Sequence, residues 1–189
     1  MGRVVLVLLV LVVGTSSCAS RSPGGSLVTA QPKFVDLAHI LPDDLDPTAD
    51  CAASKDPTPK GVVGLADQLN CIEGKGSQIA GGYVDVYLFE TPAALQDSFT
   101  AINVTYNFFP ASAGKTCPPK DSGAEGRLSW KNGDGHGTVE CYGTSDGGHV
   151  YIWTNEPAQA LFFTKVGKAI SFGKLHLWWT RTGCCSANM

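Results

Sequence analysis

The chain has 189 residues, a formal net charge of −3 and only 16% charged residues. This length predicts a single domain, which can bury roughly two-thirds of its unfolded surface. The charge balance leaves no excess of basic residues, so we expect no nucleic-acid partner. The 22 glycines and 11 prolines favour a turn-rich domain over a helical bundle.

The N-terminus has the pattern of a secretory signal. Arg3 precedes an unbroken apolar run over residues 4–13, which is too short for an ordinary membrane-spanning helix. Small residues then lead to Cys18, and this arrangement resembles a bacterial lipobox, with Thr15 where leucine is usual. The resemblance implies cleavage before Cys18, lipidation of its thiol, and a lipoprotein held by acyl chains such as palmitate at the extracytoplasmic side of the cell membrane.

An odd number of cysteines in an exported protein requires an explanation. The chain has seven, namely Cys18, Cys51, Cys71, Cys117, Cys141, Cys184 and Cys185. Lipidation of Cys18 would leave an even number, whereas the alternative is an ordinary signal peptide cleaved nearby, with Cys18 discarded or free. We assign residues 1–17 to the signal peptide, 18–33 to the lipidated cysteine and a flexible tether, 34–183 to an extracytoplasmic domain and 184–189 to a C-terminal tail.

The predicted domain opens with a short helix or turn over residues 34–45, because Pro42 prevents a longer helix. Asp43, Asp44 and Asp46 follow this point. They lack the glycine and distal glutamate of a calcium-binding loop, so we interpret them as a solvated acidic turn.

In residues 82–90, Val84, Val86 and Leu88 alternate with Tyr83, Asp85 and Tyr87, which predicts a half-buried strand. The pair Thr91-Pro92 then predicts a helix start, with threonine at the N-cap and proline at the first helical position. The apolar face expected to pack on the sheet contains Ala94, Leu95, Phe99 and Ile102, and the face expected in water contains Gln96, Asp97 and Ser98.

Residues 135–155 predict the central hairpin of the domain. Its arms, residues 138–142 and 150–154, are rich in β-branched and aromatic side chains, and Asp146-Gly147-Gly148 suits the turn between them. A short strand over residues 128–131 precedes it. Cys141 lies within the first arm and is the obvious partner for Cys117, which lies in a long loop.

The sequence after the hairpin predicts a helix over residues 158–167 that covers the sheet, followed by an apolar segment over residues 172–180. That segment ends in Trp178 and Trp179, which could not share one side if it were extended. The expected fold class is α+β: an antiparallel sheet with helices packed on one face, held by disulfides and preceded by a lipoprotein signal peptide.

The order of cysteines and aromatic residues in the chain carries a family resemblance. The pattern consists of Cys51, Cys71, Cys117-Pro118, Cys141, Ile152-Trp153-Thr154 and Leu177-Trp178-Trp179. It resembles the extracytoplasmic, sensor-like domain of actinobacterial and mycobacterial serine/threonine protein kinases and related stand-alone lipoproteins, over roughly residues 34–180. The resemblance implies a displayed binding domain with Cys51–Cys71 and Cys117–Cys141 bridged. The sequence has none of the phosphotransfer motifs of a kinase.

Other candidates for chemistry are weak. None of the four histidines has metal-ligand spacing, so we expect neither a metal nor another cofactor. His136 and His149 flank the hairpin and are possible cross-strand neighbours. Cys184 and Cys185 leave three options open: a strained vicinal bridge, bonds to the domain, or pairing with another molecule. The four tryptophans predict core packing, with Trp153 and Trp178 as weak ligand-binding candidates.

We therefore expect a non-enzymatic lipoprotein anchored through Cys18, whose domain binds an unidentified envelope ligand or protein. The main alternative is an envelope hydrolase or redox enzyme with a site assembled from dispersed residues. A structural or antigenic surface protein without a ligand is the third possibility.

Overall fold

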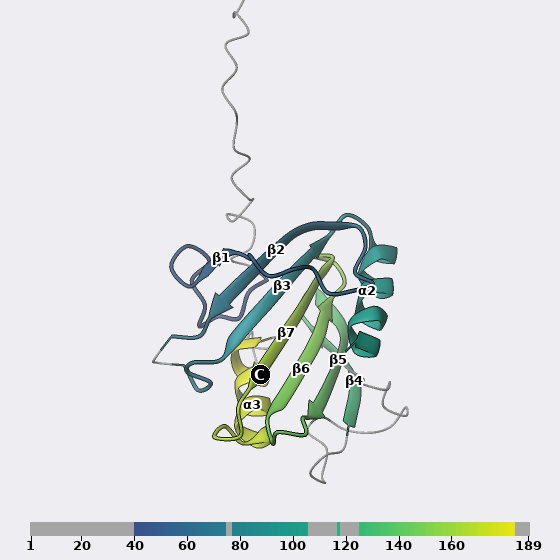
Figure 1. The fold of residues 1–189 in the computed structure, drawn as a ribbon. Coiled ribbons are helices and arrows are strands. Elements are labelled where there is room, and N and C mark those ends of the chain that lie inside the picture. The colour runs from purple at the N-terminus through teal and green to yellow at the C-terminus, as the bar shows by residue number, and fades with distance from the viewer. Residues whose placement is uncertain (1–39, 75–76, 106–116, 118–124, 184–189) are drawn as a thin grey trace, which may run out of the picture. The chain divides into compact units, whose positions relative to one another are not determined.

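Seven antiparallel strands form the frame of the domain (Figure 1). The computed structural model describes residues 40–74, 77–105, 117 and 125–183. The strand order is β1-β2-β3-β7-β6-β5-β4. The strands are β1 (Cys51–Ala53), β2 (Leu65–Ile72), β3 (Tyr83–Phe89), β4 (Glu125–Asn132), β5 (Gly135–Gly143), β6 (His149–Asn155) and β7 (Ala160–Val166). The predicted antiparallel sheet is confirmed. Cys18, the signal peptide, the tether, Cys184 and Cys185 lie outside the described residues.

The predicted hairpin is strands β5 and β6. Their register places Val139 opposite Trp153 and Gly143 opposite His149, and Gly147 adopts a φ of 81° in the turn, a conformation that glycine accepts readily. His136 lies opposite Lys131 of β4 instead. The two histidines are therefore at opposite ends of the hairpin, and the expectation that they are neighbours is wrong.

Strand β7 occupies the segment in which the sequence predicts a helix over residues 158–167. It pairs with β3 on one side and β6 on the other, so it lies inside the sheet. Leu161, Phe162 and Phe163 are consecutive and all buried, because both faces of the sheet are covered at this point. A strand buried on both faces has no polar alternation, and its apolar run is hard to distinguish from a helix by periodicity.

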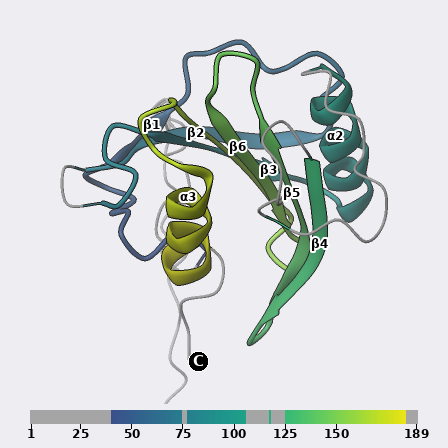
Figure 2. The same cartoon turned by 90° about the horizontal axis from the view of Figure 1, so that it is seen from below.

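Helices α2 and α3 lie on opposite faces of the sheet, as Figure 2 shows. Helix α2 (Pro92–Thr105) starts where the sequence predicts, and the Thr91 hydroxyl accepts a hydrogen bond from the backbone N–H of Ala94 at 3.1 Å. Helix α3 (Phe172–Trp178) continues into a π-helical turn, η1 (Trp179–Gly183). The expectation that the helices share one face is wrong, because residues 172–178 are helical and cover the face that α2 leaves free.

Each face of the sheet has its own apolar core. On the α3 side, Trp153 stacks on Phe162 with ring centroids 4.9 Å apart, and Trp178 meets Trp153 edge-on at 6.2 Å. On the α2 side, Leu95, Phe99 and Ile102 pack against residues of β3, β7 and β6. Within the described residues, no helix has the length and apolar character needed to cross a bilayer.

Candidate functional site

The connection from β1 to β2, residues 54–64, crosses the sheet on the side of α2 (Figure 1). We call this segment the strap. Near its start, the Gln68 side chain donates a hydrogen bond to the Ser54 hydroxyl at 3.0 Å. Near its end, the Ser98 hydroxyl of α2 accepts from Val63 N–H at 3.2 Å, and the Thr105 hydroxyl donates to the carbonyl of Lys60 at 3.1 Å. The strap is therefore tied at both ends and spans the sheet between them.

Two glycines allow the strap to lie against α2. Gly61 and Gly64 have φ values of 89° and 61°, which other residues adopt only with strain. A Cβ atom at Gly61 would lie 2.9 Å from the Cβ of Ala101, and one at Gly64 would lie 2.7 Å from the Cβ of Ala94. The contact also explains Ser98, which is fully buried against the strap rather than facing water as the sequence suggests.

Beneath the strap, strands β2 and β3 form the floor of a cleft of about 560 Å³, a size within the range of small-molecule sites. We call it the β2–β3 cleft. The register pairs Gln68 with Tyr87, Asn70 with Asp85 and Ile72 with Tyr83. Its lining residues are Asp56, Pro57, Pro59, Gln68, Asn70, Ile72, Gly81, Gly82, Tyr83, Asp85 and Tyr87. Helix α2 covers the neighbouring strands with apolar contacts and leaves this floor polar.

Asp85 lies at the centre of the floor, where the Asn70 side-chain amide donates a hydrogen bond to its Oδ1 at 2.7 Å. Burial raises the pKa of the Asp85 carboxyl above its ordinary value; the Asn70 hydrogen bond opposes this effect and the nearby Asp56 charge adds to it. A carboxyl group with a raised pKa in a cleft is a typical feature of functional sites. The sequence analysis predicts only an alternating strand here and misses the site; the one signal that could have indicated it is the aspartate within that strand.

The tryptophans suggested by the sequence do not reach this cleft. Trp153 is 1% exposed and Trp178 is fully buried, and both belong to the core on the opposite face. Core packing accounts for them, so the structure does not support their use as ligand-binding residues. Two tyrosines line the cleft instead: Tyr83 is partly exposed, whereas Tyr87 is 4% exposed and also belongs to the core under α2.

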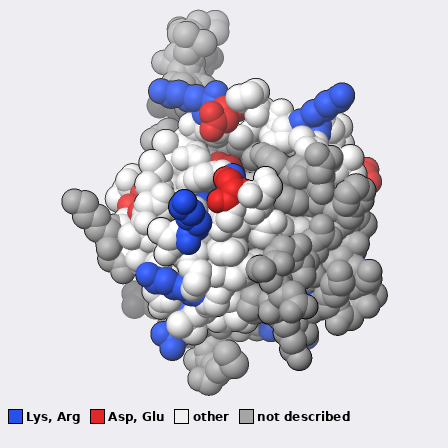
Figure 3. Space-filling view, turned by 60° about the horizontal axis from the view of Figure 1, so that its bottom comes forward, with Lys and Arg blue, Asp and Glu red and all other residues white. Residues whose placement is uncertain are grey.

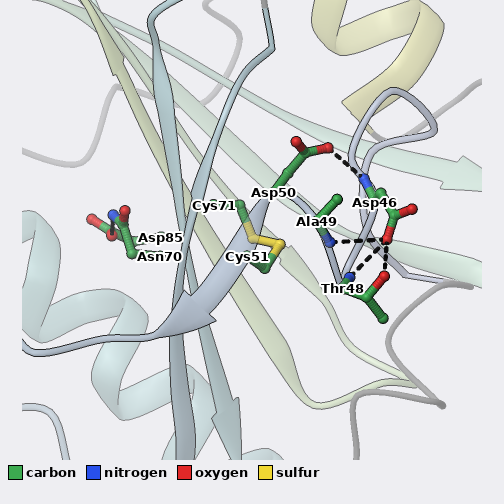
Figure 4. The surroundings of a disulfide bond; sticks show 8 residues. All are labelled: Asp46, Thr48, Ala49, Asp50, Cys51, Asn70, Cys71 and Asp85. Carbon is green, nitrogen blue, oxygen red and sulfur yellow. Dashed lines mark hydrogen bonds between the residues drawn. A yellow bond between two sulfur atoms is a disulfide. The ribbon is translucent and has the colours of Figure 1, made fainter.

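The structure contains both cysteine bridges, Cys51–Cys71 and Cys117–Cys141. Cys51 and Cys71 are direct cross-strand partners with Cα atoms 4.0 Å apart. Figure 4 shows Asn70 and Asp85 on the other side of the strands from this bridge, because neighbouring residues of a strand alternate between faces. The bridge therefore fixes the edge next to the cleft without lining it.

The acidic residues before β1 are only partly the solvated turn that the sequence predicts. Asp46 is exposed and accepts hydrogen bonds from Thr48 and Ala49, and the Thr48 hydroxyl in particular lowers the pKa of Asp46. Asp44 instead accepts from Trp178 Nε1 at 3.0 Å and from the Ser77 hydroxyl at 2.9 Å. Asp44 thus links the start of the domain to α3. Among the described residues, no group of three or more His, Cys, Asp or Glu side chains is arranged to hold a metal ion.

Glu73 is a buried carboxyl group next to Asp44. Its side chain is 2% exposed, and neither carboxyl oxygen has a hydrogen-bond partner within the described part of the chain. Burial raises the pKa of Glu73 from 4.5 to about 7; the nearby Ser77 hydroxyl opposes this effect, and the charges of Asp44 and Asp50 add to it. A raised pKa means that the folded state binds the Glu73 proton more tightly than the unfolded state does.

We expect Glu73→Gln to stabilise the protein at pH 8 and to leave its stability nearly unchanged at pH 4. The ionised carboxylate destabilises the fold progressively as pH rises from 4.5 to about 7. The shift corresponds to at most about 3 kcal/mol. Urea unfolding across this pH range measures the effect, with the exposed Glu90→Gln as the matched control. Equal stabilisation at both pH values would contradict the assignment.

A second buried polar cluster lies under α2 at the other edge of the sheet. Glu140 is fully buried and forms an ion pair with Arg127, while the single Tyr142 hydroxyl lies within hydrogen-bonding distance of both Glu140 and, at 2.8 Å, Asn103 Oδ1. The Arg127 guanidinium also lies over the Phe99 ring at 5.7 Å. Only Glu140 is buried in this pair, since the Arg127 side chain is 36% exposed. Through Phe99 and Asn103 the cluster links α2 to β4 and β5.

Two arrangements that suggest catalysis do not meet its geometric requirements. Tyr151 and His176 Nδ1 are hydrogen-bonded at 2.8 Å, but Tyr151 is fully buried in an aromatic cluster with Trp179 and Phe172. The sequence Gly143-Thr144-Ser145-Asp146-Gly147 matches the letters of a nucleophile elbow. It forms the turn between two strands, β5 and β6, whereas the elbow joins a strand to a helix.

Known proteins give no further guide to the site. No protein-family model matches the chain, and no curated protein is similar to it in sequence. The surface charge does not indicate a site either: on the face in Figure 3, most described residues are uncharged, and acidic and basic side chains are interspersed. We therefore choose the β2–β3 cleft as the candidate site on its geometry alone.

Proposed function

We propose that the protein is a membrane-anchored lipoprotein of a bacterial envelope, of the actinobacterial type that its sequence resembles, with a non-enzymatic domain that binds a ligand or partner. The observation that carries the proposal is the β2–β3 cleft, which is open, walled by the strap and floored by paired polar side chains. The cleft presents hydrogen-bonding groups and aromatic surface, and among the described residues no histidine, cysteine, serine or lysine lines it. This composition favours recognition over nucleophilic catalysis.

The anchor is supported by the N-terminal pattern, in which an apolar run is followed by small residues and Cys18. The bridged cysteines are consistent with an oxidising compartment, where structural disulfides persist. The domain would stand outside the membrane with its cleft accessible to envelope components.

The alternative of an envelope hydrolase has one feature in its favour, which is the raised pKa of Asp85 close to a second carboxylate, Asp56. Pairs of carboxyl groups with separated pKa values act as acid and base in glycoside hydrolysis. Asp56 belongs to the exposed strap, whereas catalytic carboxylates need a fixed position. Hydrolysis of an envelope glycan that is abolished in Asp85→Asn would establish this alternative.

We expect Cys18→Ala to transfer the full-length protein from the membrane fraction to the soluble fraction. Each buried CH₂ group of the acyl chains contributes about 0.8 kcal/mol, so the loss of the lipidated thiol removes the anchor altogether. Fractionation of the native host, with mass spectrometry of the N-terminal peptide, measures both localisation and acylation. Ser17→Ala is the matched control, because it keeps the small residue before the thiol.

Unchanged membrane association of Cys18→Ala would contradict the anchor. The binding role has a separate readout, which is native mass spectrometry of the wild-type protein extracted from its own membranes. A ligand that co-purifies and is lost after substitution at the cleft supports the role. Turnover of that ligand on incubation would contradict the non-enzymatic assignment.

A further inference from the structure

We propose that the β2–β3 cleft recognises a cationic ligand through an ammonium group, which binds beside Asp85 and Asp56. This inference rests on the proposed binding function and names the chemical class of the ligand. It is carried by three observations: the charges that line the cleft, the aromatic rings on either side of Asp85, and the exposed apolar side chain at one end of the floor.

The charges in the cleft are all of one sign. Within the described part of the chain, its titratable lining residues are the carboxyl groups of Asp56 and Asp85 and the phenols of Tyr83 and Tyr87, with no lysine, arginine or histidine among them. The two carboxyl groups lie close enough for the Asp56 charge to disfavour ionisation of Asp85. A bound cation removes this repulsion, whereas an anion adds to it. Charge complementarity therefore selects a positively charged group.

The rings of two tyrosines flank Asp85 along β3. Tyr83, Asp85 and Tyr87 are spaced by two residues and so project from the same face of the strand, and all three line the cleft. Tyr83 also packs on Phe163 with ring centroids 6.3 Å apart, which limits its rotation. Tyr87 is 4% exposed and belongs to the core under α2, so the accessible ring is that of Tyr83. A ring face next to a carboxylate suits an ammonium group, because the face attracts a cation.

The floor also gives room for the apolar part of an amine. Ile72 lies opposite Tyr83 and is 60% exposed, an unusual position for a large apolar side chain. Pro57 and Pro59 of the strap form the facing wall. Methylene groups next to an ammonium group can contact this surface, and the Asn70 and Gln68 amides remain as hydrogen-bonding groups for the rest of the ligand.

The test uses three probes with the same five-carbon chain and different charges: cadaverine, pentane-1,5-diol and glutarate. Each probe is titrated into the folded full-length protein at low ionic strength. The chemical shifts of the backbone amides are followed by two-dimensional NMR. We expect cadaverine to shift the amides of Asn70, Gly82 and Asp85 in a saturable way and the other two probes to have little effect. Added salt should weaken the response, because it screens charge.

Two variants remove one charge each from the cleft. Asp56→Asn changes an exposed strap residue, and Asp85→Asn keeps the shape of the half-buried residue on β3. Either change should weaken cadaverine binding about tenfold, the usual effect of losing a charge-assisted hydrogen bond. Asp134→Asn is the matched control, since Asp134 is an exposed acidic residue in the turn between β4 and β5, at the far edge of the sheet. It should leave the affinity unchanged.

Each outcome bears on one proposal or the other. Equal shifts with the diol, or equal weakening by Asp134→Asn, would overturn cation recognition and leave a binding cleft for neutral ligands. The absence of any saturable shift with cadaverine would overturn this inference as well. The co-purifying ligand in native mass spectrometry is an independent test of the binding function, so the two failures can be told apart.

Discussion

Replacing Trp178 with alanine should lower the free energy of unfolding by about 4 kcal/mol, the usual range for deleting a buried tryptophan. Trp178 is fully buried, meets Trp153 edge-on at 6.2 Å and donates from Nε1 to Asp44 at 3.0 Å. It is the residue through which α3 joins both the sheet and the start of the domain. Urea unfolding followed by circular dichroism measures the loss.

Two further variants separate the contributions at this site. Trp178→Phe keeps an aromatic ring but loses the hydrogen bond to Asp44, so it should cost about 1 to 3 kcal/mol. Leu177→Ala is the control, because Leu177 lies next to Trp178 and is 41% exposed; it should cost less than about 1 kcal/mol. A loss below about 1 kcal/mol for Trp178→Ala would show that α3 does not depend on this contact.

The same variants test the separation of the two faces. Trp178 belongs to the core on the α3 side, whereas the β2–β3 cleft opens on the α2 side. Trp178→Phe should therefore leave the binding properties of the cleft unchanged while it lowers stability. A ligand-binding role for this tryptophan would instead reduce affinity in the folded variant.

The local sequence pattern correctly predicted the elements that have one buried face and one exposed face. The first half of α2 shows this: Thr91 caps the helix, Leu95 and Phe99 face the sheet, and Gln96 faces water. The hairpin of β5 and β6 has turn residues at its tip and β-branched arms, which also act over short range. Where one face of an element is buried and the other is exposed, the spacing of its apolar residues indicates both the type of element and the face that packs on the core.

The sequence predictions failed for elements that are buried on both faces. Strand β7 has apolar residues on both sides, because α2 and α3 cover opposite faces of the sheet. Nothing within residues 158–167 reports that a second helix will cover the other face. The burial of Ser98 has the same origin, since its partner Val63 is 35 residues away in the chain.

The cleft could not be predicted from the sequence for a related reason. Its floor requires the register of β2 and β3, and its wall requires the strap to pass over that floor. Gly61 and Gly64 allow the strap to cross, but glycine is common in loops. The reason that these two positions require glycine, which is their close approach to α2, is visible only in the structure. The cysteine pairs were more accessible, because the pattern of cysteines itself suggested both bridges.

The double variant Cys51→Ala/Cys71→Ala should lose about 3 kcal/mol of stability, since the bridge closes a loop of about 20 residues in the unfolded chain. It should also expose β1 locally. This strand has three residues and lies at the edge of the sheet, and the bridge holds it against β2 at a directly opposed pair. Its amides, and that of Ser54, which donates to Gln68 at 2.9 Å, should exchange faster with solvent.

The matched comparison is Cys117→Ala/Cys141→Ala, whose bridge has a nearly equal sequence separation of 24 against 20 residues. The entropic contributions of the two bridges should therefore agree within a few tenths of a kcal/mol. Amide exchange at β1 should increase only in the first variant, because Cys141 lies on β5 at the other side of the sheet. Because Ser54 begins the strap, loss of the first bridge should also loosen one wall of the cleft and weaken cadaverine binding in the folded protein. Unchanged exchange at β1 would show that its backbone pairing suffices, and the bridge would then act on the unfolded chain alone.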